Sequence, residues 1–102
     1  MAFTRAHLYS QADQLTSHFA RAISHPARIC IILQLFTDGP CTVEELMESQ
    51  PISQPSISQH LAILRKLQLV IYKEECPYTY YSLNFQNVRR FKKQMKQFLR
   101  LI

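Results

Sequence analysis

Apolar and polar residues repeat along this chain mostly with the period of a helix. Between residues 6 and 24, apolar side chains recur every three or four positions, which is the spacing along one face of a helix. The next stretch, 27–36, follows Pro26 and is almost wholly apolar. Its length and its proline start favour a buried helix over a buried strand. The side chains expected to point inward from this helix are Ile29, Ile32, Leu33 and Phe36.

Two shorter helices are predicted after a stop signal at residues 38–40. Thr42 and Glu45 match the capping box, in which each side chain accepts a backbone N–H of the other residue at the start of a helix. A second helix is predicted over 53–67, where Ser53 is a good N-cap residue. Two short helices joined by a tight turn form the helix–turn–helix pattern.

The period then changes to two. Residues 70–74 and 79–83 alternate as strands do, and the turn-forming residues 75–78 separate them, so a β-hairpin is predicted. Residues 86–102 return to helical spacing and predict a last helix. This order predicts a mainly α fold with a small β-hairpin, a winged helix–turn–helix, in one domain over residues 1–102.

Composition narrows the class of protein. The chain has 102 residues, 47% of them apolar, which suits one globular domain with a modest core, and its net charge of +5 points to a polyanionic partner. No apolar run is long enough to cross a membrane, and the N-terminus lacks the apolar segment of a signal peptide. We therefore expect a cytoplasmic protein with no membrane partner, in which Cys30, Cys41 and Cys76 are free thiols.

The helix predicted over 53–67 carries a polar face suited to DNA. Ile57, Leu61 and Leu64 form its apolar face, while the other side carries hydroxyls and amides near its start and no acidic residue. Such groups can hydrogen-bond to base edges and phosphates at close range. An ordinary amphipathic surface helix is the alternative interpretation of this stretch taken alone.

Three motifs resemble the ArsR/SmtB family of bacterial repressors. Residues 23–29, Ile-Ser-His-Pro-Ala-Arg-Ile, resemble the family's L-S-x-P-x-R-L motif. Residues 53–64, Ser-Gln-Pro-Ser-Ile-Ser-Gln-His-Leu-Ala-Ile-Leu, resemble its recognition helix, S-Q-x-x-V-S-x-H-L-x-x-L. Residues 80–83, Tyr-Tyr-Ser-Leu, resemble the Y-Y-x-L that closes the wing of the family.

The resemblance implies a homodimeric repressor that binds operator DNA, with the recognition helix in the major groove. It also places Lys73 of the wing against the DNA backbone or the minor groove, with Tyr78 and Thr79 as further candidates. Residues 74–77 replace the family's basic, glycine-containing wing tip with two glutamates, a cysteine and a proline. The residues expected to contact double-stranded DNA are Gln54, Ser56, Ser58, Gln59, His60, Arg65, Lys66 and Lys73.

Two of these assignments have alternatives. His60 lies on the flank of its helix, so base contact and packing both stay open. Arg65 and Lys66 are better placed for phosphates or solvent than for bases.

The metal sites of the resembled family are missing from this sequence. Relatives that sense metal carry a Cys-x-Cys segment before the recognition helix, or Asp, His and Glu on the last helix. Here Cys41 stands alone in the first segment, and residues 86–102 contain none of these ligand types. His7 and His18 could share one helix face, but they lack carboxylate partners. We expect no metal site and no cofactor.

The cysteines leave other functions open. Cys30 is expected to be a packed core thiol, Cys41 to have a pKa lowered by the following helix N-terminus, and Cys76 to lie at an exposed turn. A thiol- or metal-responsive regulator therefore stays an alternative, as does a winged-helix module for protein–protein docking. The chain lacks paired catalytic carboxylates, a nucleophile motif and a glycine-rich loop, so an enzyme is not expected.

The first and last predicted helices carry apolar stripes that one small core can hardly cover together. We expect these helices to form a homodimer, and the basic residues of the last helix to strengthen the positive field toward DNA. The alternative is that both helices pack only within one chain. The expected interface residues are Leu8, Leu15, Phe19, Val88, Phe91, Met95 and Phe98.

Overall fold

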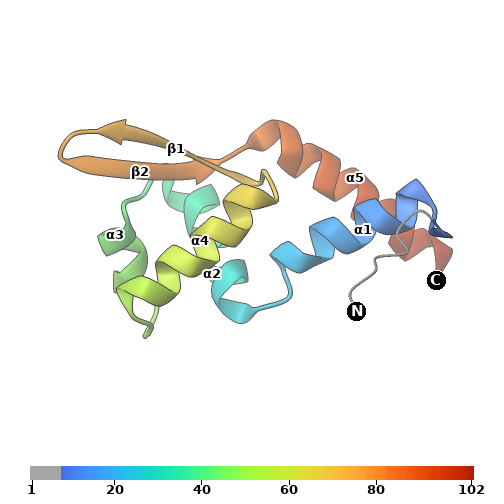
Figure 1. The fold of residues 1–102 in the computed structure, drawn as a ribbon, viewed down its shortest axis with the longest axis horizontal. Helices are drawn as coiled ribbons and strands as arrows, with labels where there is room; N and C mark the ends of the chain where they lie inside the picture. The colour runs from blue at the N-terminus through green and yellow to red at the C-terminus, as the bar shows by residue number, and fades with distance from the viewer. Residues whose placement is uncertain (1–7) are drawn as a thin grey trace.

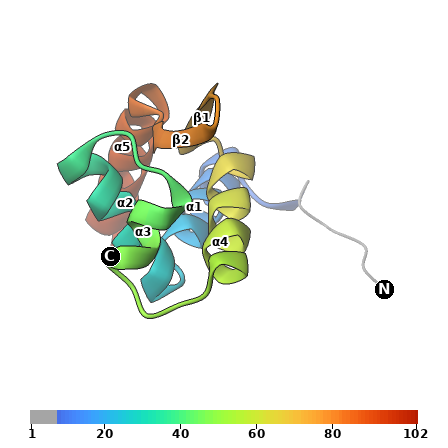
Figure 2. The same cartoon turned by 90° about the vertical axis from the view of Figure 1, so that its left-hand side faces the viewer.

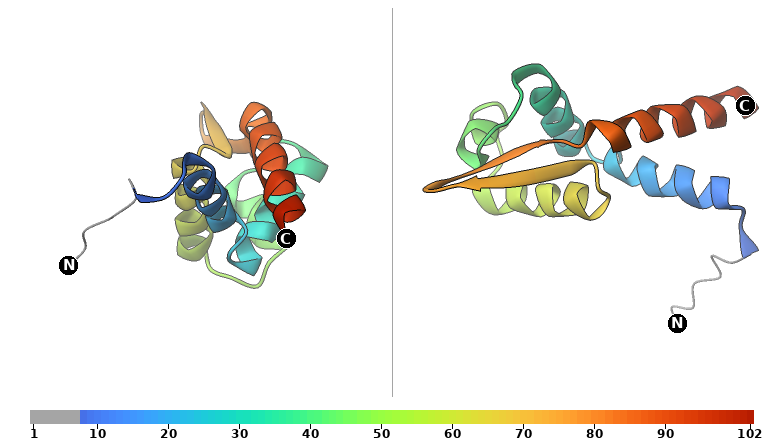
Figure 3. Two further views of the ribbon diagram at one scale, coloured as in Figure 1. Left: turned by 90° about the vertical axis from the view of Figure 1, so that its right-hand side faces the viewer. Right: turned by 90° about the horizontal axis from the view of Figure 1, so that it is seen from above.

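The computed structural model describes residues 8–102 and confirms the predicted winged helix–turn–helix order. The elements are α1 (Gln11–Ala22), α2 (Pro26–Asp38), α3 (Val43–Glu48), α4 (Gln54–Lys66), β1 (Val70–Glu75), β2 (Tyr78–Leu83) and α5 (Phe85–Leu101). Figure 1 shows α2, α3, α4 and the hairpin gathered at one end, while α1 and α5 run side by side toward the other. Seen from above, the hairpin and the α1–α5 pair extend in opposite directions (Figure 3).

The first helix begins later than the sequence pattern indicated. The Ser10 Oγ accepts the backbone N–H of Asp13 at 3.0 Å, so the helix starts at Gln11 instead of residue 6. The predicted helical residues 6 and 7, with His7, lie outside the described residues. Leu8 precedes α1 and is exposed, so its expected place on the helical stripe is wrong.

The second helix has the predicted proline start, and its cap lies just before it. His25 Nδ1 accepts the backbone N–H of Ala27 at 3.0 Å, which satisfies a donor that the first turn leaves unpaired. Gly39 ends the helix with a φ of 78°, a left-handed conformation that glycine adopts without a steric penalty.

The face that α2 buries differs from the predicted one. Ile31 and Leu35 are buried, whereas Ile29, Leu33 and Phe36 are 41%, 60% and 66% exposed. Since this helix is apolar on several sides, periodicity alone could not rank its faces. Of the four residues expected inward, Ile32 is half-buried against the core.

The second strand of the hairpin is tied to the helical part. The strands pair antiparallel from Val70 opposite Leu83 to Glu75 opposite Tyr78. Cys41, just before α3, exchanges two backbone hydrogen bonds with Tyr81 of β2, at 2.9 and 2.8 Å. The hairpin is therefore held beside α3, on the opposite side of the molecule from the loop that joins α3 to α4 (Figure 2).

One apolar core joins the helices and the base of the hairpin. Phe19 of α1 packs edge-on against Phe91 of α5, with ring centres 5.5 Å apart. The buried members of the core are Phe19, Ala22, Ile31, Leu35, Cys41, Leu46, Ile57, Leu61, Leu64, Leu67, Leu69, Val70 and Leu83.

No helix among residues 8–102 is both long and apolar enough to cross a bilayer.

Candidate nucleic-acid interface

The helix–turn–helix begins with two side-chain caps. At the start of α3, Thr42 Oγ1 accepts the Glu45 N–H at 3.2 Å, and Glu45 Oε1 accepts the Thr42 N–H at 3.0 Å, as the capping-box pattern predicted. At the start of α4, Ser53 Oγ accepts the backbone N–H of Ser56 at 3.4 Å. These contacts fix where each helix starts, and hence which residues stand on its outer face.

Packing then sets the rotation of α4. Ile57, Leu61 and Leu64 are at most 1% exposed and lie in the core, where α4 also contacts α3 and α2. The opposite face points to solvent, with Gln54, Ser58 and Gln59 exposed. No residue of α4 is acidic. This face can donate to and accept hydrogen bonds from base edges without repelling phosphates.

The other short polar residue of this face is partly used within the chain. Ser56 is half-buried, and its hydroxyl accepts a hydrogen bond from Ser53 Oγ at 3.1 Å. Gln54, Ser58 and Gln59 are therefore the freest polar side chains at the start of α4.

His60 has partners inside the chain. Its Nδ1 lies 3.1 Å from Nη1 of the buried Arg28, and its ring centre lies 4.5 Å from that of His25. The pKa of His60 is lowered by burial and by the charges of His25 and Arg28. Of the two alternatives that its flank position left open, these contacts favour packing over base contact.

The basic residues at the end of α4 are exposed, as a phosphate contact requires. The guanidinium carbon of Arg65 lies 4.2 Å from the ring centre of Tyr72 on β1, so a cation–π contact joins α4 to the wing. Lys66 is exposed. A hollow lined by Ala62, Arg65, Lys66 and the first residues of β1 separates the helix from the hairpin.

The wing carries little positive charge. Lys73 is exposed and pairs with Glu75 at 3.2 Å. Glu74 and Glu75 also flank the tip, while Tyr78 is exposed and Thr79 is half-buried. Since the lysine charge is partly offset by its neighbours, this wing offers less positive charge than the end of α4, where Arg65 and Lys66 are exposed.

The cysteines correct one sequence expectation. The pKa of Cys41 is raised, first by burial and then by the carboxylates of Glu45 and Asp38, so the expected lowering is wrong. Its Sγ donates to the Gly39 carbonyl at 3.3 Å. Cys30 is half-buried, not a fully buried core thiol, and Cys76 is exposed at the hairpin turn as predicted. All three are free thiols.

Among residues 8–102, no group of three or more His, Cys, Asp or Glu side chains is arranged to hold a metal ion. His18 Nε2 lies 3.4 Å from the backbone carbonyl of Leu67. This histidine therefore has a contact within the chain.

The residues expected at a dimer interface have different surroundings. Phe19 is 2% exposed and packs on Phe91 within the same chain, so it has almost no surface to offer a partner. Phe98 is 41% exposed. Four of the expected residues are half-buried against the core of their own chain: Leu15, Val88, Phe91 and Met95.

Sequence reasoning missed one residue beside this interface, Arg28. It is 7% exposed and contacts α1, the α1–α2 connection and α4. A signal was present, because an arginine interrupts an otherwise apolar helix and stands in one of the three motifs. A charge amid apolar residues is buried only with partners.

Comparison with protein families gives a match over this same region. A family model described as "Bacterial regulatory protein, arsR family" matches residues 25–72, from the cap of α2 into β1. The transcriptional repressor SdpR of Bacillus subtilis is 41% identical over 64 residues, covering 63% of this chain and 70% of that protein. The HTH-type transcriptional repressor SmtB of Mycobacterium tuberculosis is 44% identical over 50 residues, but the match covers only 36% of its length.

Solved structures agree on the fold. A crystal structure described as a possible transcriptional regulator for arsenical resistance matches with a TM-score of 0.71 at 30% identity. The match covers 79% of this chain and 83% of that one. The similarity thus extends from sequence motifs to the arrangement of the helices and the hairpin.

Proposed function

The chain belongs to the arsR family of bacterial regulatory proteins, and from this premise we propose that it is a transcriptional repressor that binds operator DNA sequence-specifically as a homodimer. The family is one of transcriptional regulators, not of enzymes. In this proposal α4 enters the major groove, and the bases are read by the exposed polar side chains at its start. Lys66, Arg65 and, more weakly, Lys73 contact phosphates.

The observation that carries the proposal is the outer face of α4. Gln54, Ser58 and Gln59 are exposed on a helix without acidic residues, and the core holds the opposite face in place. Glutamine and serine can bond to base edges in the major groove. The net charge of +5 adds attraction to the DNA backbone.

The geometry of DNA supports the proposed dimer. One recognition helix reads only a few base pairs, and a two-fold dimer places two such helices about 34 Å apart, one turn of DNA. The distant ends of α1 and α5 supply apolar surface for this contact (Figure 3). The exposed apolar residues there are Leu8, Tyr9, Phe98, Leu99, Leu101 and Ile102.

The buried packing of Phe19 refines the proposed interface. We assign the direct contacts to the exposed residues at the end of the α1–α5 pair that lies away from the hairpin, beginning with Leu8 and Phe98 (Figure 3). Leu15, Val88, Phe91 and Met95 then contribute the part of their surface that the protomer leaves open. Phe19 packs edge-on against Phe91 in the interior of the protomer and makes no direct contact with the partner in this proposal.

The experiment that tests the proposal begins with selection of bound sequences from a random pool of DNA duplexes. Affinity for the selected sequence and for unrelated DNA is then measured at two salt concentrations. We expect a steep loss of affinity with salt, because phosphate contacts release counterions. Gln59→Ala should weaken specific binding by about 1–3 kcal/mol while leaving binding to unrelated DNA nearly unchanged.

Gln97→Ala is the matched control, because Gln97 is an exposed glutamine on α5, away from α4. If Gln59→Ala and Gln97→Ala bind the selected sequence alike, α4 does not read bases as proposed. Failure to select any sequence, together with affinity that is insensitive to salt, would favour a protein-docking module instead.

A further inference from the structure

The buried side chain of Arg28 joins three separate segments. Its Nε donates to the carbonyl of Arg21 near the end of α1 at 3.1 Å, and its Nη2 donates to Ser24 Oγ at 2.7 Å. Its Nη1 reaches His60 of α4, 3.1 Å away. The guanidinium thus bridges the end of α1, the α1–α2 connection and the recognition helix.

The chemistry of arginine determines the state of His60 in this bridge. A guanidinium only donates hydrogen bonds, so the Nδ1 of His60 must accept from Arg28. The imidazole is therefore neutral, with its proton on Nε2. Protonation would turn Nδ1 into a donor and place a second positive charge 3.1 Å from the arginine nitrogen.

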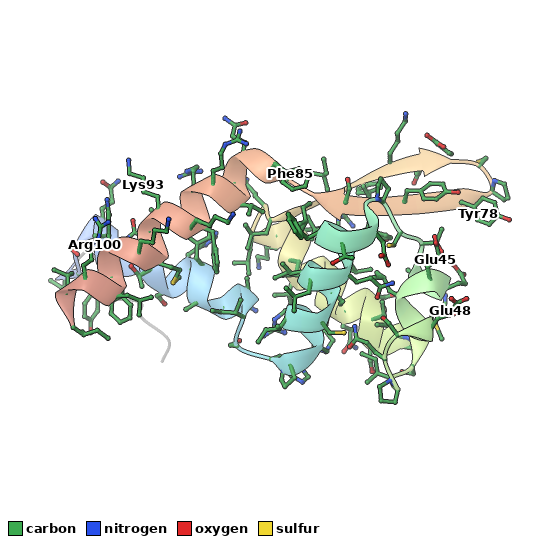
Figure 4. The ribbon with its side chains drawn as sticks, turned by 180° about the vertical axis from the view of Figure 1, so that it is seen from behind. Glu45, Glu48, Tyr78, Phe85, Lys93 and Arg100 are labelled. Atoms are coloured by element: carbon green, nitrogen blue, oxygen red, sulfur yellow. The ribbon has the colours of Figure 1, made fainter. Side chains whose placement is uncertain are left out.

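We infer that Arg28 and His60 are positioning residues that hold the recognition helix on the end of α1, and that protonation of His60 releases this hold and weakens DNA binding in mild acid. The inference rests on the proposed DNA-binding function. It links the α1–α5 pair, where the proposed dimer forms, to the helix that reads DNA. Figure 4 shows α2, which carries Arg28, lying across the back of α4.

The surroundings of His60 support the neutral form. Burial lowers the pKa of His60 below its ordinary value of 6.5, and the charges of His25 and Arg28 lower the pKa further. The neighbouring α3, which packs against α4, carries the acidic residues Glu44, Glu45 and Glu48, but the charges that shift the pKa of His60 are those of His25 and Arg28.

The direction of the pH effect follows from linkage. Because the pKa of His60 is lower in the folded chain, the unfolded chain takes up this proton first as the pH falls. The stabilisation from the neutral bridge is fully present above pH 6.5 and is lost as the pH falls from there through the folded-state pKa. Protonation of other histidines adds positive charge and would strengthen DNA binding, so a loss of affinity in acid points to the bridge.

The first measurement needs no DNA. An NMR titration of the full chain follows the ring C–H signals of its four histidines from about pH 8 to about pH 5. His60→Asn assigns the His60 signal, and we expect His60 to titrate below the ordinary value of 6.5. A His60 pKa at or above that value would overturn the inference, whatever the chain binds.

The second measurement compares affinity for the selected duplex at about pH 7.5 and about pH 5.5, at constant ionic strength. We expect the affinity of the wild-type chain to fall about tenfold, because a loss of this size corresponds to about one hydrogen bond to a charged group. His60→Asn keeps a side-chain acceptor but does not titrate, so it should bind alike at both pH values. His25→Ser keeps a helix cap and removes the other ring of the pair, and it should retain the acid sensitivity.

His18→Asn is the matched control, since it removes a histidine from α1 that has no contact with Arg28. It should lose affinity in acid as the wild type does. Parallel pH profiles for the wild type and His60→Asn would overturn the inference. If no variant binds DNA even at about pH 7.5, the proposed function fails, and the NMR titration still decides the state of His60.

Discussion

The proposed recognition helix α4 and the last helix α5 are both amphipathic, but they bury different kinds of residue. On α4, the buried residues are Ile57, Leu61 and Leu64, all apolar. On α5, the two buried residues are polar, Asn87 and Gln94. The apolar residues of α5 are exposed at its first residue, Phe85, half-buried at Val88, Phe91 and Met95, and exposed again toward its end.

The difference shows which of the two helices has its apolar side covered within one chain. The apolar side of α4 is covered by its own core, so its rotation is set before any partner arrives. α5 is instead anchored by polar contacts: Gln94 Nε2 donates to Thr16 Oγ1 of α1 at 2.9 Å, and Asn87 Nδ2 donates to the Gln68 carbonyl at 2.7 Å. These contacts and the packing of Phe91 on Phe19 hold α5 in place, and apolar surface stays exposed toward its end, where the proposed dimer would form.

The largest effect should come from charging the end of α5. The double variant Phe98→Glu with Leu101→Glu should convert a dimer at micromolar concentration into monomers. Each apolar side chain buried in an interface contributes about 1.5–3 kcal/mol, and a two-fold contact counts each twice. Sedimentation velocity measures the change, and Lys96→Glu on an exposed residue of α5 is the control, because this single substitution changes the net charge by the same two units as the double variant.

A wild-type chain that sediments as a monomer and still binds its duplex tightly would remove the basis of the dimer proposal. Phe91→Glu is less suitable as a test, because Phe91 packs on the buried Phe19 and its loss would also damage the core.

Truncation on α4 should have the next largest effect. Leu64 is fully buried, so Leu64→Ala should lower the free energy of unfolding by about 2–5 kcal/mol, through lost burial and a residual cavity. Urea denaturation measures this loss. Leu33→Ala is the same substitution at a site that is 60% exposed, and it should change the stability far less. Equal losses at both sites would contradict the burial of α4 described above.

The polar anchor of α5 should contribute less. Gln94→Met keeps the length of the side chain but removes the donor to Thr16, so the free energy of unfolding should fall by about 0.5–1.5 kcal/mol. Gln97→Met, at an exposed site one turn further on, serves as the control. A stability of Gln94→Met equal to that of Gln97→Met would mean that packing alone holds α5 against α1.

The smallest effect is expected at the exposed end of α4. Arg65→Ala should cost about 0.5–1 kcal/mol of stability, because it removes the cation–π contact with Tyr72. Arg100→Ala, at an exposed site in the last turn of α5, should cost less. Thermal unfolding of both variants side by side provides the comparison, and a larger loss for Arg100→Ala would show that the contact with Tyr72 adds no stability.

Local features of this chain were determined by its sequence alone. The capping box of Thr42 and Glu45, the cap at Ser53 and the proline start of α2 each involve residues within four positions of one another. The change of period from helical to alternating likewise located the hairpin, with each strand only slightly longer than expected. Such signals are short-range, so they can be recognised without knowing what packs on them.

Only the tertiary structure decided which residues meet across the chain. It set which face of α2 is buried, gave His60 a partner 32 residues away, and raised the pKa of Cys41 where a helix start alone predicted a lowering. It also placed two polar residues of α5 in the interior. These outcomes depend on burial and on charges brought near by folding, and a linear pattern of residue types carries neither quantity.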